Sequence, residues 1–137
     1  MGLLIGLLLA GITGVYHHAV LRLLDRLTGR DKRRPNVTVL GIFIGLLLLH
    51  TTEILAWVYA YQTLHSLPGM GEFGGNFNGS WQDFVYYSGI NYMTLGYTQI
   101  ETSGDLRLVS MMESLLGFMI ITWSATFIYS AWQKAFR

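Results

Sequence analysis

The sequence contains no cysteine, only two prolines and few charged residues. Without cysteine the chain can form no disulfide and offers no thiol for catalysis. Charged residues make up 12 % of the chain, against roughly 25 % in soluble domains, which argues against a soluble protein. The formal net charge of +1 provides no basic field for binding nucleic acid. The chain also lacks a nucleophile–base pair, a phosphate loop and a zinc motif, so we expect neither enzymatic activity nor a cofactor.

Three long apolar stretches fill most of the chain, at residues 2–21, 37–64 and 108–132. A helix needs about 20 apolar residues to cross a membrane, and each stretch is long enough. No positive charge precedes the first stretch, so it lacks the pattern of a cleaved signal peptide. The sequence therefore predicts an all-α membrane protein with three transmembrane helices, surrounded by membrane lipid.

The distribution of positive charge predicts the topology. Lys134 and Arg137 follow the last stretch, and the connection after the first stretch contains Arg22, Arg26, Arg30, Lys32, Arg33 and Arg34. Positively charged loops stay on the cytoplasmic side. We therefore expect a multi-pass protein of the inner or plasma membrane, with its N-terminus outside and its C-terminus in the cytoplasm.

The segment between the second and third stretches is too short to cross the membrane twice. Residues 66–80 are rich in glycine and are expected to form a loop, and Ser80 is a candidate N-cap for an aromatic-rich segment at residues 81–99. Both ends of this segment lie on the same side, so it lies on the surface or dips in and returns. A dipping segment with irregular backbone must be buried in protein or line water, which implies a pore shared with other copies.

The dipping segment ends in Thr94-Leu95-Gly96-Tyr97, the first four positions of the filter signature Thr-Val-Gly-Tyr-Gly. Together with the aromatic run before it and a glycine-containing helix after it, this part of the chain resembles small bacterial potassium channels of the two-helix pore-loop family. The resemblance covers residues 37–132, and the first helix is additional. It implies a pore-loop tetrameric cation channel with three transmembrane helices and one re-entrant pore helix per subunit. It also implies a homotetramer that holds K⁺ at the carbonyls of Thr94, Leu95, Gly96, Tyr97 and Thr98.

The resemblance divides the chain into two parts. Residues 1–35 form the first transmembrane helix and a basic cytoplasmic loop, and residues 36–137 form the pore domain. Within the pore domain we expect an outer helix at 37–64, an extracellular loop at 65–80, a pore helix at 81–93, a filter at 94–98 and an inner helix at 107–132.

Two positions at the outer end of the filter depart from the family pattern. Thr98 stands where the family has glycine, and Gln99 stands where it has aspartate. A β-branched residue disfavours positive φ, so we expect Thr98 to rearrange the outer ion site. Potassium-preferring conduction, weakly selective cation conduction and a non-conducting or partner-dependent subunit all stay open.

Other candidate residues lie at the pore mouth and along the inner helix. Gln99, Glu101 and Asp105 are expected at the outer mouth, where acidic groups raise the local cation concentration. Gly117 is either a gating hinge, as the family resemblance suggests, or a site of close packing. The candidates for the inner pore lining are Ile121, Ala125 and Ile128. No voltage-sensing helix of spaced arginines is present, so gating is expected from the membrane, pH, ions or a separate regulatory subunit.

Polar residues also occur inside the apolar stretches. His50 and Glu53 share one helix face, and Glu113 lies in the third stretch. They are either a proton-sensitive gate or filter brace, or they form hydrogen bonds between helices. His50 and Glu53 alone are too few ligands for a metal site.

The first and second stretches contain features that predict helix packing. His17 and His18 are expected to pack or to lie at the membrane interface. The glycine pairs at 2 and 6 and at 41 and 45 predict close approach between helices.

Overall fold

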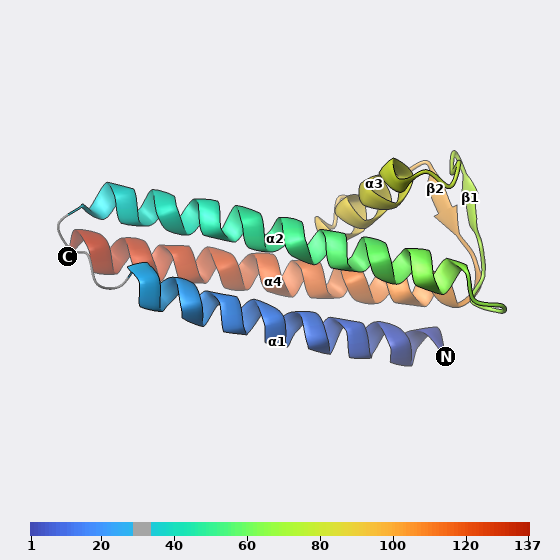
Figure 1. Ribbon diagram of the computed structural model, residues 1–137, viewed down its shortest axis with the longest axis horizontal. Helices are drawn as coiled ribbons and strands as arrows, with labels where there is room; N and C mark the ends of the chain where they lie inside the picture. Colours follow the sequence, from blue (N-terminus) through green and yellow to red (C-terminus); the bar gives the residue numbers. More distant parts are fainter. Residues whose placement is uncertain (29–33) are drawn as a thin grey trace.

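The structure is a computed structural model that describes residues 1–28 and 34–137. Its helices are α1 (Gly2–Thr28), α2 (Pro35–His65), α3 (Trp81–Tyr92) and α4 (Gly104–Phe136), and its strands are β1 (Phe73–Gly75) and β2 (Ile100–Thr102). Helices α1, α2 and α4 lie side by side along the long axis, with the C-terminus at the end opposite to α3 and the strands (Figure 1). Three of the basic residues used for the topology, Arg30, Lys32 and Arg33, lie outside the described residues.

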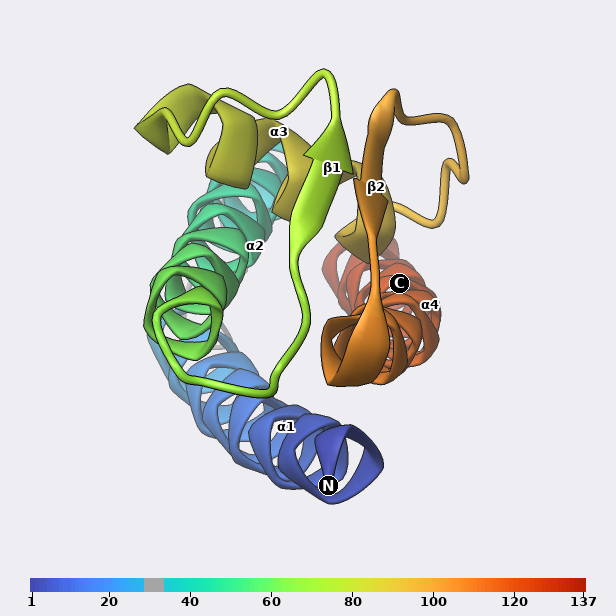
Figure 2. The ribbon, with the colours of Figure 1, turned by 90° about the vertical axis from the view of Figure 1, so that its right-hand side faces the viewer.

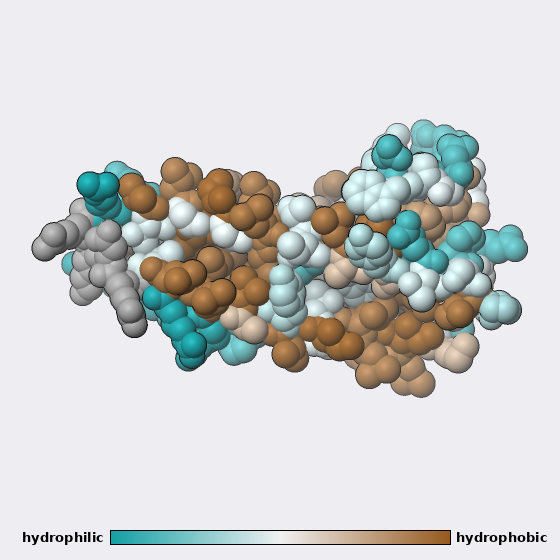
Figure 3. All heavy atoms as spheres, viewed as in Figure 1, coloured by the Kyte–Doolittle hydropathy of each residue, from teal (hydrophilic) through white to brown (hydrophobic). Residues whose placement is uncertain are grey.

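The three long helices match the three predicted membrane spans. They contain 27, 31 and 33 residues, and each is long and apolar enough to cross a membrane. Apolar side chains cover long stretches of their surface, and polar side chains gather toward the ends of the molecule (Figure 3). Helix α3 has 12 residues, too few to cross a membrane. The predicted all-α membrane fold with a short additional helix is confirmed.

Helix α1 packs mainly along α4 and also touches α2 (Figure 2). Gly2 and Gly6 of α1 permit the approach to α4, because a Cβ at Gly6 would lie 2.8 Å from Cβ of Met112. In α2, a Cβ at Gly45 would lie 2.6 Å from a methyl of Leu24, but a Cβ at Gly41 would meet nothing within 4 Å. Three of the four paired glycines therefore lie at close contacts.

Strands β1 and β2 form a small antiparallel two-stranded sheet above the start of α4 (Figure 2). Helix α3 lies between the two strands in the chain, and we call their pairing the hairpin for its shape alone. Gly75 lies opposite Ile100 in this pairing. The hairpin is tied to α4 because the N–H of Leu106 donates to the carbonyl of Met70 at 2.9 Å. This bond satisfies one of the N–H groups that the first turn of a helix leaves without an internal partner.

The largest core cluster is aromatic and joins α2, α3, α4 and the hairpin. The ring of Tyr61 lies edge-on to the rings of Phe73 and Tyr87, at centroid distances of 5.9 and 5.3 Å. Phe84 and Trp57 are also buried in this cluster. Edge-to-face aromatic packing of this kind is favourable, so α3 is held at a fixed position against α2 and α4.

Candidate functional site

Helix α3 begins with the cap that the sequence predicts. The N–H of Asp83 donates to the Ser80 hydroxyl at 3.1 Å, and the N–H of Ser80 donates to the Asp83 carboxylate at 3.2 Å, forming a capping box. The N–H of Asn78 also donates to this carboxylate, at 2.9 Å. The bond from Asn78 is the main reason that the pKa of Asp83 lies below its ordinary value.

Helix α3 ends at the start of the predicted filter in a Schellman motif. The N–H of Leu95 donates to the carbonyl of Ile90 at 3.1 Å, and the N–H of Thr94 donates to the carbonyl of Asn91 at 2.9 Å. This motif requires positive φ at the residue after the cap, and Thr94 has φ 55°. Glycine normally occupies that position, so a β-branched threonine there is unusual.

The segment after this turn has backbone carbonyl groups without hydrogen-bond partners among the described residues. Gly96 has φ 64°, so positive φ recurs two residues after Thr94. Within residues 1–28 and 34–137, no donor reaches the backbone oxygens of Thr94, Leu95, Gly96 or Tyr97. The side chains of Leu95 and Tyr97 are 63 % and 71 % exposed. The segment thus presents free carbonyls on an exposed surface of the single chain.

The outer end of the segment is fixed by side chains that replace the family's glycine and aspartate. The N–H of Ile100 donates to the Thr98 hydroxyl at 3.0 Å, and Thr98 has no positive φ. Gln99 accepts a hydrogen bond from the side-chain amide of Asn76, and its backbone carbonyl accepts from the N–H of Asn76 at 3.0 Å. Thr98 and Gln99 therefore tie the segment to the hairpin and to the loop before α3.

A polar cluster joins all four helices at the depth of the membrane, and we call it the His–Glu cluster. Its members are His17 of α1, His50 and Glu53 of α2, Tyr92 of α3 and Ser124 of α4. The two oxygens of the Glu53 carboxylate lie 2.9 Å from Nδ1 of His17 and 3.2 Å from Nδ1 of His50.

Tyr92 and Ser124 complete the His–Glu cluster from the other two helices. The Tyr92 hydroxyl donates to Glu53 and lies 2.8 Å from Nδ1 of His50. Ser124 places its hydroxyl 3.3 Å from Nε2 of His17. His17, Glu53 and Tyr92 are fully buried, and the side chain of His50 is 21 % exposed.

Glu113 lies in a separate network behind α3. Its carboxylate accepts hydrogen bonds from the hydroxyls of Tyr61 and Ser88, both at 2.6 Å. Ser88 also lies 3.2 Å from the backbone oxygen of Ile54. Glu113 is fully buried, so this network links α2, α3 and α4 through bonds that no water can replace.

The inner-helix candidates fall in different environments of the single chain. Gly117 lies against the carbonyl oxygen of Tyr92, and a Cβ at this position would overlap that oxygen. Ile121 packs against the aromatic core, Ile128 packs near the other end of α2, and Ala125 is exposed. Pore lining by these three residues stays a prediction, because it depends on neighbouring copies.

The expected mouth residues lie at the same end of the molecule as the hairpin. Glu101 is exposed and pairs with Gly74 in the hairpin. The carboxylate of Asp105 lies 3.6 Å from the amino group of Met1, so α1 begins beside the start of α4.

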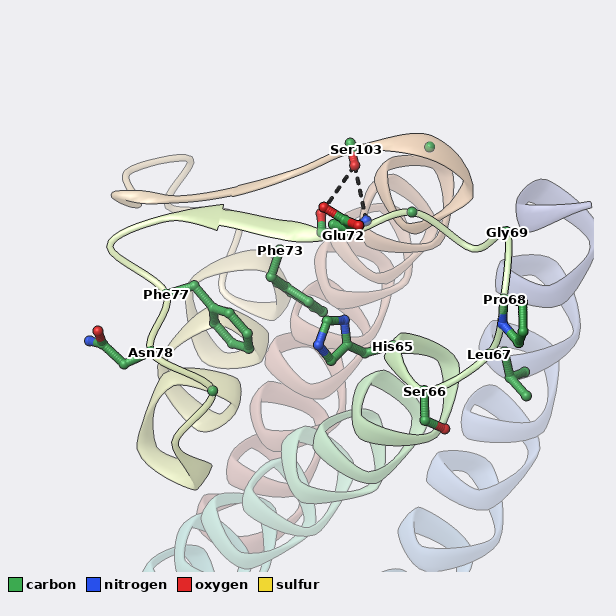
Figure 4. Close-up of a pocket in the computed structure, with 13 residues that line it drawn as sticks. His65, Ser66, Leu67, Pro68, Gly69, Glu72, Phe73, Phe77, Asn78 and Ser103 are labelled. Carbon is green, nitrogen blue, oxygen red and sulfur yellow. Dashed lines mark hydrogen bonds between the residues drawn. The ribbon is translucent and has the colours of Figure 1, made fainter.

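An open cavity of about 830 Å³ lies beside the hairpin, apart from residues 94–98. Figure 4 shows the ring of His65 beside those of Phe73 and Phe77, at centroid distances of 5.4 and 5.8 Å. Ser103 closes one side of the cavity, because its hydroxyl accepts from the N–H of Glu72 at 2.9 Å. The cavity is lined mainly by the loops before and after β1, together with the end of α2 and the start of α4, and none of residues 94–98 lines it.

Several residues of these two hydrogen-bond networks could not be identified from the sequence. His17 and Tyr92 are members of the His–Glu cluster, and Tyr61 and Ser88 bind Glu113. The available signal was that polar groups inside apolar helices tend to face protein partners. That signal identifies such residues but does not give their partners on other helices.

Comparison with known proteins supports the resemblance to pore-loop channels that the sequence indicates. Residues 47–134 match the family model described as ion channel. Over 95 residues the chain is 36 % identical to a protein of Bacillus subtilis (strain 168) named as an uncharacterized membrane protein, YdjJ. The match covers 63 % of this chain and 27 % of that relative, so the chain spans about a quarter of its length. No solved structure matches the chain. The family match covers more than half of the chain and α2, α3 and α4 have the expected order, so this multi-pass membrane protein belongs to the two-helix pore-loop ion channel family.

Proposed function

We propose that the chain forms a homotetramer that conducts cations, with a preference for K⁺, through a filter built from residues 94–98. The supporting observation is that the carbonyls of Thr94, Leu95, Gly96 and Tyr97 accept no hydrogen bond from the described residues. A carbonyl without a partner is costly in a membrane. Rings of carbonyls from four copies can replace the hydration shell of K⁺, so the ion and the carbonyls satisfy each other.

The helix before the filter favours a positive ion. Residues 94–98 follow directly on the C-terminal end of α3, which carries the partial negative charge of the helix dipole. Acidic residues occur at the same end of the molecule, among them Glu72 and Glu101 of the hairpin region and Asp105 at the start of α4. Repeated in four copies, these charges would raise the cation concentration at the mouth.

The proposed orientation puts the filter end outside the cell and the C-terminus in the cytoplasm. Lys134 near the C-terminus lies 3.6 Å from Asp25 of α1, so the two basic segments approach each other at one end of the molecule. Arg22 and Arg26 belong to the same end of α1. Positive charge marks the cytoplasmic side, in agreement with this orientation.

Weakly selective cation conduction is the second candidate function. The observation that favours it is that Thr98, at the outer end of the segment, has no positive φ, whereas the family has glycine at this position. An outer ring in this conformation differs from the family's glycine-containing ring. The inner rings from Thr94 to Tyr97 would then carry the selection by themselves.

A flux assay on the purified full chain in liposomes tests the proposal. K⁺ and Na⁺ gradients are compared, and Ba²⁺ is added as a blocker. The test variant is Gly96→Ala, because φ 64° is strained for alanine although a Cβ there would meet nothing within 4 Å. The matched control is Gly41→Ala in α2, where a Cβ also meets nothing within 4 Å and φ is helical.

The proposal predicts Ba²⁺-sensitive K⁺ flux that Gly96→Ala reduces at least tenfold and Gly41→Ala leaves unchanged. Equal flux of Na⁺ and K⁺ would support the second candidate instead. Flux that Gly96→Ala does not alter would contradict the assignment of the filter. Absence of flux from a preparation shown to be tetrameric would indicate a subunit that keeps the fold without conducting.

A further inference from the structure

The His–Glu cluster has a composition and spacing that its role in helix packing does not require. Three potential metal ligands, one ring nitrogen each of His17 and His50 and a carboxylate oxygen of Glu53, lie within 4.8 Å of one another. His50 and Glu53 share a face of α2, and α1 brings His17 against them from 36 residues away. The sequence alone indicated only two ligands, and the fold adds His17 as the third.

We propose that His17, His50 and Glu53 bind a divalent transition-metal ion of the Zn²⁺ type, with the Tyr92 hydroxyl as fourth ligand. Two imidazoles and one carboxylate are a ligand set that zinc uses in proteins. Ligands at about 2.0–2.1 Å in a tetrahedron lie about 3.3 Å from one another. In the structure Oε1 of Glu53 lies 2.9 Å from Nδ1 of His17, and Oε2 of Glu53 lies 3.2 Å from Nδ1 of His50, so small side-chain movements place both imidazoles and the carboxylate around one ion.

The chemistry of the donors selects a transition metal over Ca²⁺ or Mg²⁺. Those harder ions require six or more ligands, which are mostly oxygen. The cluster offers two imidazole nitrogens and few oxygens, a set that suits zinc and its neighbours. The negative charge of the Glu53 carboxylate offsets part of the charge of a divalent ion in the low-dielectric interior, which reduces the cost of burial.

The surroundings of the cluster have features of a built metal site. Ser124 lies 3.3 Å from Nε2 of His17, so it orients the ring with Nδ1 toward Glu53. The rings of His17 and His50 stack at a centroid distance of 5.6 Å. His50 is the partly exposed member, and it gives an ion a side of entry. A bound ion would connect α1 and α2 to Tyr92, two residues before the filter segment.

The test is metal binding by the purified full chain after treatment with a chelator. Co²⁺ is titrated as a spectroscopic probe, because four-coordinate Co²⁺ absorbs in the visible range, and Zn²⁺ is then added as a competitor. The proposal predicts one Co²⁺ per chain, a four-coordinate spectrum and displacement by Zn²⁺. In His17→Gln, the affinity should fall at least about 100-fold, since even residues behind the ligands change metal affinity by about 10–100-fold.

His18→Gln is the matched control. His18 is the next residue in α1, but its ring stacks on Trp123 at 5.6 Å and takes no part in the His–Glu cluster. This variant should bind Co²⁺ like the unaltered chain. If His17→Gln does not fold, His50→Gln replaces it, because the half-buried His50 tolerates substitution better.

The proposal also predicts that Zn²⁺ raises the thermal unfolding temperature of the unaltered chain and of His18→Gln, but not of the ligand variants. A wild-type chain that gives no four-coordinate Co²⁺ spectrum would overturn the proposal. Equal affinity in the ligand variants and in His18→Gln would also overturn it, because the ion would then sit at another histidine such as His65. None of these readouts depends on conduction, so failure here leaves the proposed channel function standing.

Discussion

The carbonyl oxygen of Tyr92, at the end of α3, rests directly on the backbone of Gly117 in α4. A Cβ at 117 would overlap this oxygen, so glycine is required for α3 to reach its position. Tyr92 is two residues from Thr94, where the turn into the filter segment begins. The contact therefore fixes where residues 94–98, the proposed filter, lie along α4.

Gly117→Ala should displace α3 and remove conduction. Overpacking of this kind costs about 1–3 kcal/mol, so we expect a lower thermal unfolding temperature together with loss of K⁺ flux. Gly41→Ala in α2 is the control and should change neither quantity, since its Cβ meets nothing within 4 Å. If Gly117→Ala lost flux but unfolded at the same temperature, Gly117 would be a hinge, as the family resemblance suggests, and the packing explanation would be wrong.

Tyr61→Phe should weaken the attachment of α3 to α2 and α4. The variant removes one of the two hydroxyls that donate to the buried carboxylate of Glu113. A buried acceptor left without its donor costs about 1–3 kcal/mol, so the unfolding temperature in detergent should fall. Tyr59→Phe, on the same helix but 65 % exposed, serves as control. Equal unfolding temperatures for the two variants would contradict the importance of this network.

The hydroxyl of Thr98 should be necessary for the outer end of the filter segment. Thr98→Val keeps the shape of the side chain but removes the acceptor for the N–H of Ile100, whereas Thr98→Ser keeps it. A lost hydrogen bond of this kind costs about 1 kcal/mol, enough to loosen a local turn. We expect the ratio of K⁺ to Na⁺ flux to fall several-fold in Thr98→Val and to persist in Thr98→Ser. The same ratio in both variants would show that the hydroxyl is dispensable.

Asp83 should make the start of α3 sensitive to acid. Hydrogen bonds from the N–H groups of Asn78 and Ser80 lower the pKa of this carboxyl from its ordinary 3.8, with Asn78 the larger cause. Because the folded pKa is depressed, the stabilisation is present above the ordinary value and is lost as the pH falls through the folded value. The unfolding temperature of the wild type should therefore fall further on acidification below about pH 4 than that of Asp83→Asn.

Glu101→Gln is the control for the acid-sensitivity prediction. Glu101 is an exposed carboxylate in the hairpin at the same end of the molecule. This variant should lose stability on acidification as the wild type does. If the unfolding temperature of Asp83→Asn fell with pH in the same way as that of the wild type, the capping box would not be the source of the acid sensitivity.

The positions of the helices along the chain could be predicted from the sequence because the signals for them are local. The length of each apolar stretch predicts a span, and the three long helices agree with this. Ser80 was recognised as the N-cap of α3 from its residue type and position, and the capping box confirms it. These features depend on a few neighbouring residues and on no long-range contact.

The backbone conformation at the end of α3 could not be predicted from the sequence. The family pattern indicated strain at Thr98, where the family has glycine, whereas the positive φ of a non-glycine residue occurs at Thr94. The Schellman motif that causes it normally carries glycine, so no local signal pointed to Thr94. The hairpin was also missed, because strands of three residues are too short to give an alternating pattern.

The partners of the buried polar residues depend on tertiary packing. The sequence placed His50 and Glu53 on one face, since they are three residues apart on one helix. It could not bring His17 to the same place, because that contact depends on where α1 docks. The same limit applies to Glu113, whose donors Tyr61 and Ser88 come from two other helices.

The measurement that tests the central claim most directly is the reversal potential of the purified full chain in a planar bilayer, with K⁺ on one side and Na⁺ on the other. We predict a current that reverses far from zero, in the direction of K⁺ selectivity, and that Gly96→Ala abolishes while Gly41→Ala preserves. A current that reverses near zero would contradict K⁺ preference. A selective current that survives in Gly96→Ala would show that residues 94–98 are not the filter.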